Sequence, residues 1–154
     1  MTSTALIPHA GTSAHFAQLR SIGTLPERQF PIPRATYRTR LDAGVPLTLF
    51  PEGTSTGGDD VLPFRSSLFD PVVKLGCPVT ACALRYSLEG GSVADEVAYW
   101  RDMTLAPHLL NLLGKSGVTL DMHFGPTSRR TGDRKTLARE LHAEVRALLH
   151  GRAA

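Results

Sequence analysis

The sequence has no long hydrophobic run and is poor in cysteine and aromatic residues. No apolar stretch reaches the ~18 residues of a membrane-spanning helix, and we see no signal peptide. Cys77 and Cys82 form a C-x4-C spacing without a second pair, so we expect no metal site and two small buried thiols in a reducing compartment. Aromatic residues make up 6% and do not alternate with the arginine clusters, so we expect no nucleic-acid partner.

The composition is that of one ordinary globular domain of 154 residues, with 42% hydrophobic and 20% charged residues. Its net charge of +3 is unevenly distributed. Both ends of the chain are basic, whereas residues 51–110 carry four basic and eight acidic groups. Basic ends suit phosphate head groups or nucleic acid, and solvated arginines explain any single one at least as well.

Predicted strands and helices alternate along most of the chain. We predict strands over 45–50, 78–86 and 117–125, and helices within 34–44, 69–76, 104–114 and 133–151. This alternation indicates an α/β fold with a mostly parallel central sheet and helices on both faces. Residues 1–36 hold four prolines and little periodicity, so we expect a poorly ordered or remnant segment there and a domain over 37–150.

A loop rich in small residues follows the apolar segment that ends at Pro51. Its glycines let a ligand approach the backbone, and its hydroxyl groups and amides can face an oxyanion. Arg65 follows closely in the sequence as a charged fork. The loop matches neither a phosphate-binding Walker motif nor a serine-hydrolase elbow. By composition alone, a loop with these residues is more often a plain turn than a ligand site.

Two motifs nevertheless resemble a known family. "FPEGT" at Phe50–Thr54, followed by "LPFRSSLF" at Leu62–Phe69, is similar to the phosphate-site motif of the lysophosphatidic acid acyltransferases, the glycerolipid or 1-acylglycerol-3-phosphate acyltransferases. "CPVTACAL" resembles the strand that follows in that family. Segments 97–113 and 133–149 are most similar to the branch whose acceptor is lyso-ornithine lipid. The resemblance covers about Leu41 to Leu149.

The resemblance implies an acyltransferase that moves an acyl group from acyl carrier protein or coenzyme A to a lysolipid. Phospholipid, glycerolipid or ornithine lipid biosynthesis would be its pathway, and no bound cofactor is implied. The protein would be cytoplasmic, or peripheral on the inner face of the membrane. When the family's head-group contacts are carried over to the matching positions, the head group of the acceptor would meet Glu52, Gly53 and Thr54, with Ser55 and Arg65 as weaker candidates. With a lyso-ornithine acceptor, Glu52 would instead meet an ammonium group.

The catalytic motif of that family, a histidine with an aspartate five positions later, is absent from this sequence. The histidine would deprotonate the acceptor hydroxyl, and the aspartate would orient it. None of the six histidines has this partner: His9, His15, His108, His123, His142 and His150. No catalytic residue is therefore identifiable, and Arg34 is only a guess for the family's second phosphate motif. We expect an N-terminally truncated, incomplete domain whose activity is impaired by about 10²- to 10⁴-fold.

Two alternatives remain open. The chain is a non-catalytic remnant that keeps the loop, or a module that binds lipid surfaces through basic residues. The basic residues that suit such a surface are Arg129, Arg130, Arg134, Lys135 and Arg139. Against the second alternative, the apolar stripe of the last helix is better explained as core. That stripe comprises Leu137, Leu141, Val145, Leu148 and Leu149.

Overall fold

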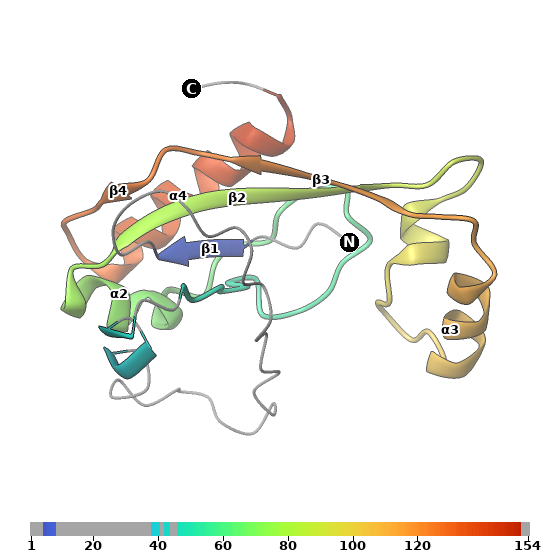
Figure 1. Ribbon diagram of the computed structural model, residues 1–154, viewed down its shortest axis with the longest axis horizontal. Helices are drawn as coiled ribbons and strands as arrows, with labels where there is room; N and C mark the ends of the chain where they lie inside the picture. Colours follow the sequence, from blue (N-terminus) through green and yellow to red (C-terminus); the bar gives the residue numbers. More distant parts are fainter. Residues whose placement is uncertain (1–4, 9–37, 41, 44–45, 152–154) are drawn as a thin grey trace.

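The computed structural model describes residues 5–8, 38–40, 42–43 and 46–151 (Figure 1). Its elements in chain order are β1 (Ala5–Pro8), η1 (Ser66–Phe69), α2 (Asp70–Leu75), β2 (Pro78–Ser87), η2 (Val93–Val97), α3 (Leu105–Leu113), β3 (Thr119–Phe124), β4 (Ser128–Arg129) and α4 (Arg134–Leu149). Residues 38–40 and 42 are also helical, within the helix predicted at 34–44. Gly44, its predicted end, lies outside the described residues, as does all of segment 1–36 except β1.

The sheet is built around β2. Cys82 of β2 lies opposite Ala5 of β1 on one edge and opposite Phe124 of β3 on the other, and β4 continues the β3 side. Each of these pairings is antiparallel, so the predicted mostly parallel sheet is not confirmed. The physical reason is the connection from β2 to β3, which runs through η2 and α3 beyond the end of the sheet (Figure 1). A parallel pair needs a crossover over a sheet face, whereas this chain returns at the end it left.

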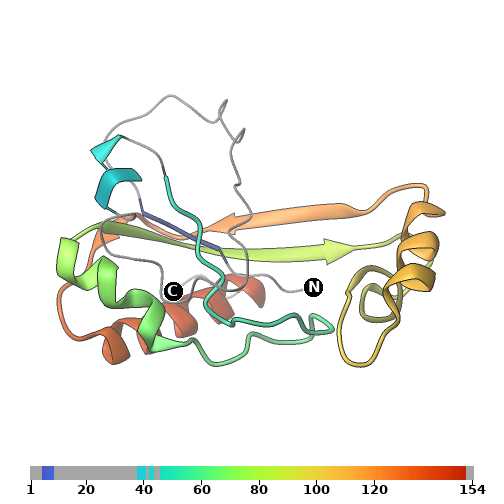
Figure 2. The ribbon, with the colours of Figure 1, turned by 90° about the horizontal axis from the view of Figure 1, so that it is seen from below.

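The core lies between one face of β2 and the helices α2 and α4, which share a side of the sheet (Figure 2). Val79, Ala81 and Ala83 of β2 point to this side at every second position. Val72 of α2 and Leu141 of α4 pack against them. The predicted apolar strand at 78–86 is confirmed as the central strand.

Helix α4 forms as the sequence predicts. The Asp133 side chain accepts hydrogen bonds from the backbone N–H groups of Lys135 and Thr136, so it is the N-cap. Gly151, at φ 68°, follows the last turn. The predicted stripe is buried at Leu137, Leu141, Val145 and Leu149, and Leu148 is partly buried. In α2 the sequence predicts Asp70 as the N-cap, but Phe69 is the N-cap and Asp70 is the first helical residue.

Two of the predicted strands differ in the structure. Over 46–50, the described part of the strand predicted at 45–50, only Leu49 forms a β-bridge, and Phe50 is 50% exposed. Apolar and polar residues alternate over 117–125, which predicts a strand with one buried face. Strand β3 forms within this range, but all six of its residues are exposed, so the predicted burial is wrong. The alternating pattern identified the strand correctly. Neither face of β3 is buried because β3 is an edge strand that extends past α4 (Figure 1).

Helix α3 ends at Gly114 as predicted but buries none of its residues. Leu110 is 70% exposed and Leu113 73% exposed. The helix lies at the far end of the molecule from α2, held near η2 by the ring contact of Tyr99 with His108, at 5.4 Å between centroids. In the described ranges, no helix combines the length and hydrophobicity needed to cross a bilayer.

The cysteines match their predicted role in part. Cys82 is 1% exposed, and burial raises the pKa of its thiol to about 11. Cys77 is only partly buried, and burial also raises the pKa of its thiol. Both are free thiols.

The core position of Leu141 gives a direct test of this packing. Leu141 is fully buried, so Leu141→Ala should lower the free energy of unfolding by about 2–5 kcal/mol. Leu110→Ala on exposed α3 removes the same atoms and should change it by less than about 0.5 kcal/mol. Chemical denaturation measured by circular dichroism compares the two. Equal losses would contradict a core centred on α4.

Candidate functional site

The loop from Pro51 to Arg65 closes on itself through three hydrogen bonds. The Gly53 N–H donates to the Phe50 carbonyl at 3.2 Å, and the Arg65 N–H donates to the Pro51 carbonyl at 2.9 Å. The Leu62 N–H donates to Glu52 Oε2 at 2.9 Å. The start and the end of the loop are therefore held side by side, although ten residues separate Glu52 from Leu62.

The Glu52 side chain points into the loop and is only 6% exposed. A carboxylate accepting a backbone N–H makes a charge-assisted hydrogen bond, which is stronger than a neutral one. In this conformation Glu52 fixes the loop from inside. Its predicted contact with an acceptor head group stays a prediction.

Gly53 and Arg65 lie against each other, as expected for residues of one site. Gly53 has φ 68°, a left-handed conformation that favours glycine. A Cβ atom at this position would lie 2.5 Å from Nε and 2.8 Å from Cζ of Arg65. The guanidinium therefore lies directly over the Gly53 backbone, in space that any other residue would fill.

The hydroxyl residues of the loop divide into two groups. Thr54 and Ser55 are exposed next to Gly53. Thr56 Oγ1 instead accepts the Gly58 N–H at 3.3 Å, so it stabilises the turn. Gly57 is buried, and a Cβ there would lie 2.6 Å from Cζ2 of Trp100, which shows why glycine is needed.

The far side of the loop is attached to α4. Both oxygens of Asp60 accept hydrogen bonds from Arg146, Nε to Oδ1 at 2.9 Å and Nη2 to Oδ2 at 2.7 Å. The bond with Arg146, helped by the Val61 N–H, lowers the pKa of Asp60 from 3.8 to about 2. His142 Nε2 lies 3.0 Å from the Val61 carbonyl oxygen. Helix α4 thus fixes the loop as well as the core.

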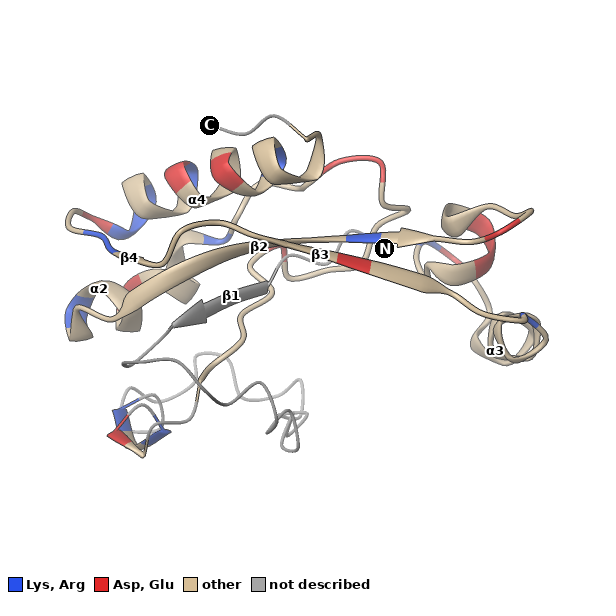
Figure 3. Ribbon diagram, turned by 45° about the horizontal axis from the view of Figure 1, so that its top comes forward, with Lys and Arg blue, Asp and Glu red and all other residues tan. Residues whose placement is uncertain are grey.

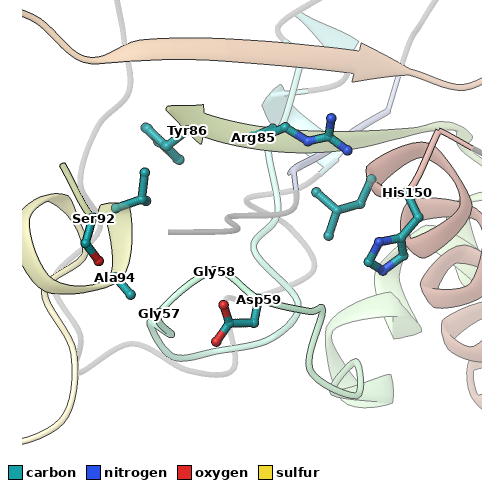
Figure 4. Close-up of a pocket in the computed structure, with 10 residues that line it drawn as sticks. Gly57, Gly58, Asp59, Arg85, Tyr86, Ser92, Ala94 and His150 are labelled. Carbon is teal, nitrogen blue, oxygen red and sulfur yellow. The ribbon is translucent and has the colours of Figure 1, made fainter. Parts of the chain in front are cut away.

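A first cavity, of about 320 Å³, lies between the loop, the end of β2, η2 and the end of α4 (Figure 4). Its polar lining includes Asp59, Arg85, Tyr86, Ser92 and His150. None of the five predicted binding residues lines it. Sequence reasoning missed this cavity, and the only signal was Arg85, where the apolar pattern of β2 ends.

A second cavity, of about 490 Å³, lies between the residues around Arg65 and α4. Its lining consists of Pro63, Phe64, Ser66, Lys135, Ala138, Arg139 and His142. Phe64 is held there by an edge contact with the His142 ring at 5.2 Å and by stacking on Phe69 at 6.1 Å. Arg65 does not line this cavity, although both its neighbours do.

The described histidines do not form the pair that the family's chemistry requires. His150 Nε2 lies 3.5 Å from Asp60 Oδ1, but Arg146 already engages both oxygens of that carboxylate. His123 is exposed on β3, and His9 and His15 lie outside the described residues. Within the described part of the chain, no three His, Cys, Asp or Glu side chains gather as a metal site.

Comparison with known proteins places this loop in a family. Residues 16–85, which include Glu52 to Arg65, match the family model described as Acyltransferase. The chain is similar to the lyso-ornithine lipid O-acyltransferase of Brucella abortus (strain 2308), at 34% identity over 124 residues that cover 71% of this chain and 46% of that protein. No solved structure matches it.

Relatives with another printed acceptor also match. The 1-acyl-sn-glycerol-3-phosphate acyltransferase of Neisseria gonorrhoeae is 30% identical over 121 residues, covering 77% of this chain and 47% of that protein. The lyso-ornithine lipid O-acyltransferase of Rhodobacter capsulatus is 38% identical over 88 residues, covering 52% of this chain and 30% of that protein. The chain thus spans less than half the length of these curated relatives. The resemblance read from the loop motifs is confirmed.

The buried carboxylate of Glu52 predicts a loop that opens when it is removed. Glu52→Ala leaves the Leu62 N–H without this acceptor and should lower the free energy of unfolding by about 1–3 kcal/mol. Hydrogen exchange at the Leu62 amide should speed up. Glu89→Ala, at an exposed turn, is the control and should change neither quantity. Unaltered exchange at Leu62 in the Glu52 variant would contradict the role given to this bond.

The lowered pKa of Asp60 predicts an acid-sensitive attachment of the loop to α4. Because the folded-state pKa lies below the ordinary value, the Asp60–Arg146 pair stabilises the fold fully above pH 3.8 and is lost as the pH falls to about 2. The stability difference between the native chain and Asp60→Asn should therefore be present at neutral pH and shrink through this range. Urea unfolding at several pH values measures it, with Asp59→Asn as control. A difference independent of pH would contradict the assignment.

Proposed function

We propose that this chain acts in acyl transfer to a lysolipid, with the loop from Glu52 to Arg65 binding the acceptor's polar head group. The acyl donor would be a thioester of coenzyme A or acyl carrier protein. The observation that carries the proposal is the family match across this loop, together with the Arg65 guanidinium lying over Gly53.

The geometry of the loop supports a head-group site at its exposed side. Arg65 is exposed and offers planar N–H donors, which suit the oxygens of a phosphate or a carboxylate. The hydroxyls of Thr54 and Ser55 are exposed beside Gly53. Glu52 supports these groups by holding the loop closed through Leu62. The site therefore combines one fixed cation with adaptable hydroxyl donors.

This chemistry does not by itself choose between the two acceptors named by the relatives. A guanidinium pairs with the phosphate of a 1-acylglycerol phosphate and with the carboxylate of an ornithine head group alike. The ammonium of ornithine would need a carboxylate, and Glu52 is the family-matched candidate if the loop rearranges. We therefore propose a lysolipid with an anionic head group as the acceptor class.

We expect slow turnover from this chain. The sequence holds no histidine with the matching aspartate, and a missing general base costs about 10²- to 10⁴-fold in rate. Positioning of the two substrates would remain as the main source of rate enhancement.

Binding to a lipid surface is a second candidate, favoured by α3. Its nine residues include no charged side chain, and Leu105, Leu110 and Leu113 are 58%, 70% and 73% exposed. Exposed apolar surface of this kind marks interaction sites, and a lipid surface is one that an acyltransferase meets. The surface role and the catalytic role are compatible, and a transfer assay run in parallel with vesicle co-sedimentation separates them.

The proposed acceptor site predicts an effect of Arg65 on transfer. The chain is incubated with labelled acyl coenzyme A or acyl carrier protein and either lysolipid, and the diacyl product is measured. Arg65→Gln should lower kcat/KM for the lysolipid by ~10-fold or more, since a charge-assisted fork is lost. Arg40→Gln, at an exposed arginine with the same charge, is the control.

Vesicle co-sedimentation runs in parallel with this assay. Turnover that Arg65→Gln does not reduce contradicts the site. A chain that binds vesicles without any turnover supports the second candidate instead.

A further inference from the structure

The second cavity combines an apolar floor with a cationic edge. Pro63, Phe64 and Ala138 supply the floor, and Lys135 and Arg139 supply the charges. Lys135, Arg139 and His142 come from successive turns of α4, at spacings of four and three residues, and so share one face of the helix. Figure 3 shows basic residues gathered at the β4 end of α4.

The two cations are not used to hold the fold. Elsewhere on α4, Arg146 pairs with Asp60, and Glu144 pairs with Arg130. Neither Lys135 nor Arg139 forms an ion pair with any residue of the described ranges, and the Arg139 Nη2 only donates to Thr136 Oγ1 at 3.3 Å.

The nearest acidic group is already occupied. Asp133 accepts hydrogen bonds from Thr136 Oγ1 at 2.7 Å and from the N–H groups that it caps. It does not line the cavity. The cationic edge is therefore free to meet an anion from outside.

The size and the floor of the cavity constrain its ligand. A volume of about 490 Å³ lies within the range of small-molecule sites and far exceeds what a free phosphate ion fills. The Phe64 ring is already fixed by His142 and Phe69, so the apolar wall is preformed. A ligand that uses both parts carries an anionic group on an apolar arm.

The backbone at Arg65 separates this cavity from the proposed acceptor site. Arg65 has extended φ and ψ of −71° and 101°. In extended backbone, successive side chains point to opposite sides, so Phe64 and Ser66 line the cavity while Arg65 turns to Gly53. Two substrates could then bind on the two sides of one short segment.

We infer that this cavity binds a phosphate group carried on an apolar arm, with the phosphate between Lys135 and Arg139 and the arm along Phe64 and Ala138. The inference rests on the proposed function, because the phosphopantetheine arm of the acyl donor carries its phosphate next to an apolar gem-dimethyl carbon, which would lie along Phe64. A lysophosphatidate acceptor has the same chemistry. The separation at Arg65 favours the donor, whose arm would approach the acceptor loop from the other side.

Calorimetric titration of the full chain tests the site with four probes: phosphopantetheine, pantetheine, inorganic phosphate and a short-chain lysophosphatidate. Phosphopantetheine should bind at least ~10-fold more tightly than either pantetheine or inorganic phosphate, since only it uses both parts of the cavity. The double variant Lys135→Gln/Arg139→Gln should remove this advantage. Its matched control is Arg134→Gln/Arg40→Gln, which removes two exposed charges outside the cavity. Melting temperatures verify that both variants fold.

The outcomes separate cleanly. If the double variant weakens lysophosphatidate and not phosphopantetheine, the cavity chemistry holds and the acceptor is its source of phosphate. Any of three results would overturn the inference. Binding is unchanged in the double variant, or the control variant loses as much binding, or inorganic phosphate binds as tightly as phosphopantetheine. Because the readout is binding, absent acyl transfer would refute the proposed function without touching this result.

Discussion

The hydrogen bond from the Leu62 N–H to the buried carboxylate of Glu52 is the constraint on which the candidate site depends. It joins the two ends of a loop whose own residues are small and mostly exposed. Only with the ends joined does Arg65 lie over Gly53 and Phe64 reach the His142 ring on α4. Together with the bond from the Arg65 N–H to the Pro51 carbonyl, this buried acceptor positions groups on both sides of one segment. Its strength comes from the low exposure of the carboxylate, where competition with water is weak.

The parts of the fold that the sequence predicts well are those with local signals. Helix α4 has an aspartate cap, a periodic apolar stripe and a closing glycine, and all three function as expected. Strand β2 is a nearly continuous apolar run that begins at Pro78 and is followed by a turn, and it forms the centre of the sheet. The antiparallel pairing was not predictable in this way, because it depends on where the connection through α3 lies in space. The same applies to the exposure of β3, whose alternation carries no information on what covers it.

In the candidate site, too, the sequence predicts the local contacts and not the long-range ones. The motif residues Gly53 and Arg65 come together because they belong to one loop with its own turn chemistry. Glu52 was predicted to face a ligand, and its burial follows from an amide ten residues away that no local pattern reveals. Both cavities join residues far apart in the chain, such as Arg85 with His150, and Phe64 with Arg139. Such sites become visible only after the long-range packing is known.

The projecting helix α3 has a consequence for the whole particle. It is uncharged, rich in leucine and distant from the folded core (Figure 1). Its exposed leucines form an apolar surface that packs against none of the described core residues, and surface of this kind favours association with other apolar surfaces. Kosmotropic salts that stabilise the core would also strengthen the association of these exposed leucines. A surfactant or another surface that covers these leucines would therefore limit self-association of the chain.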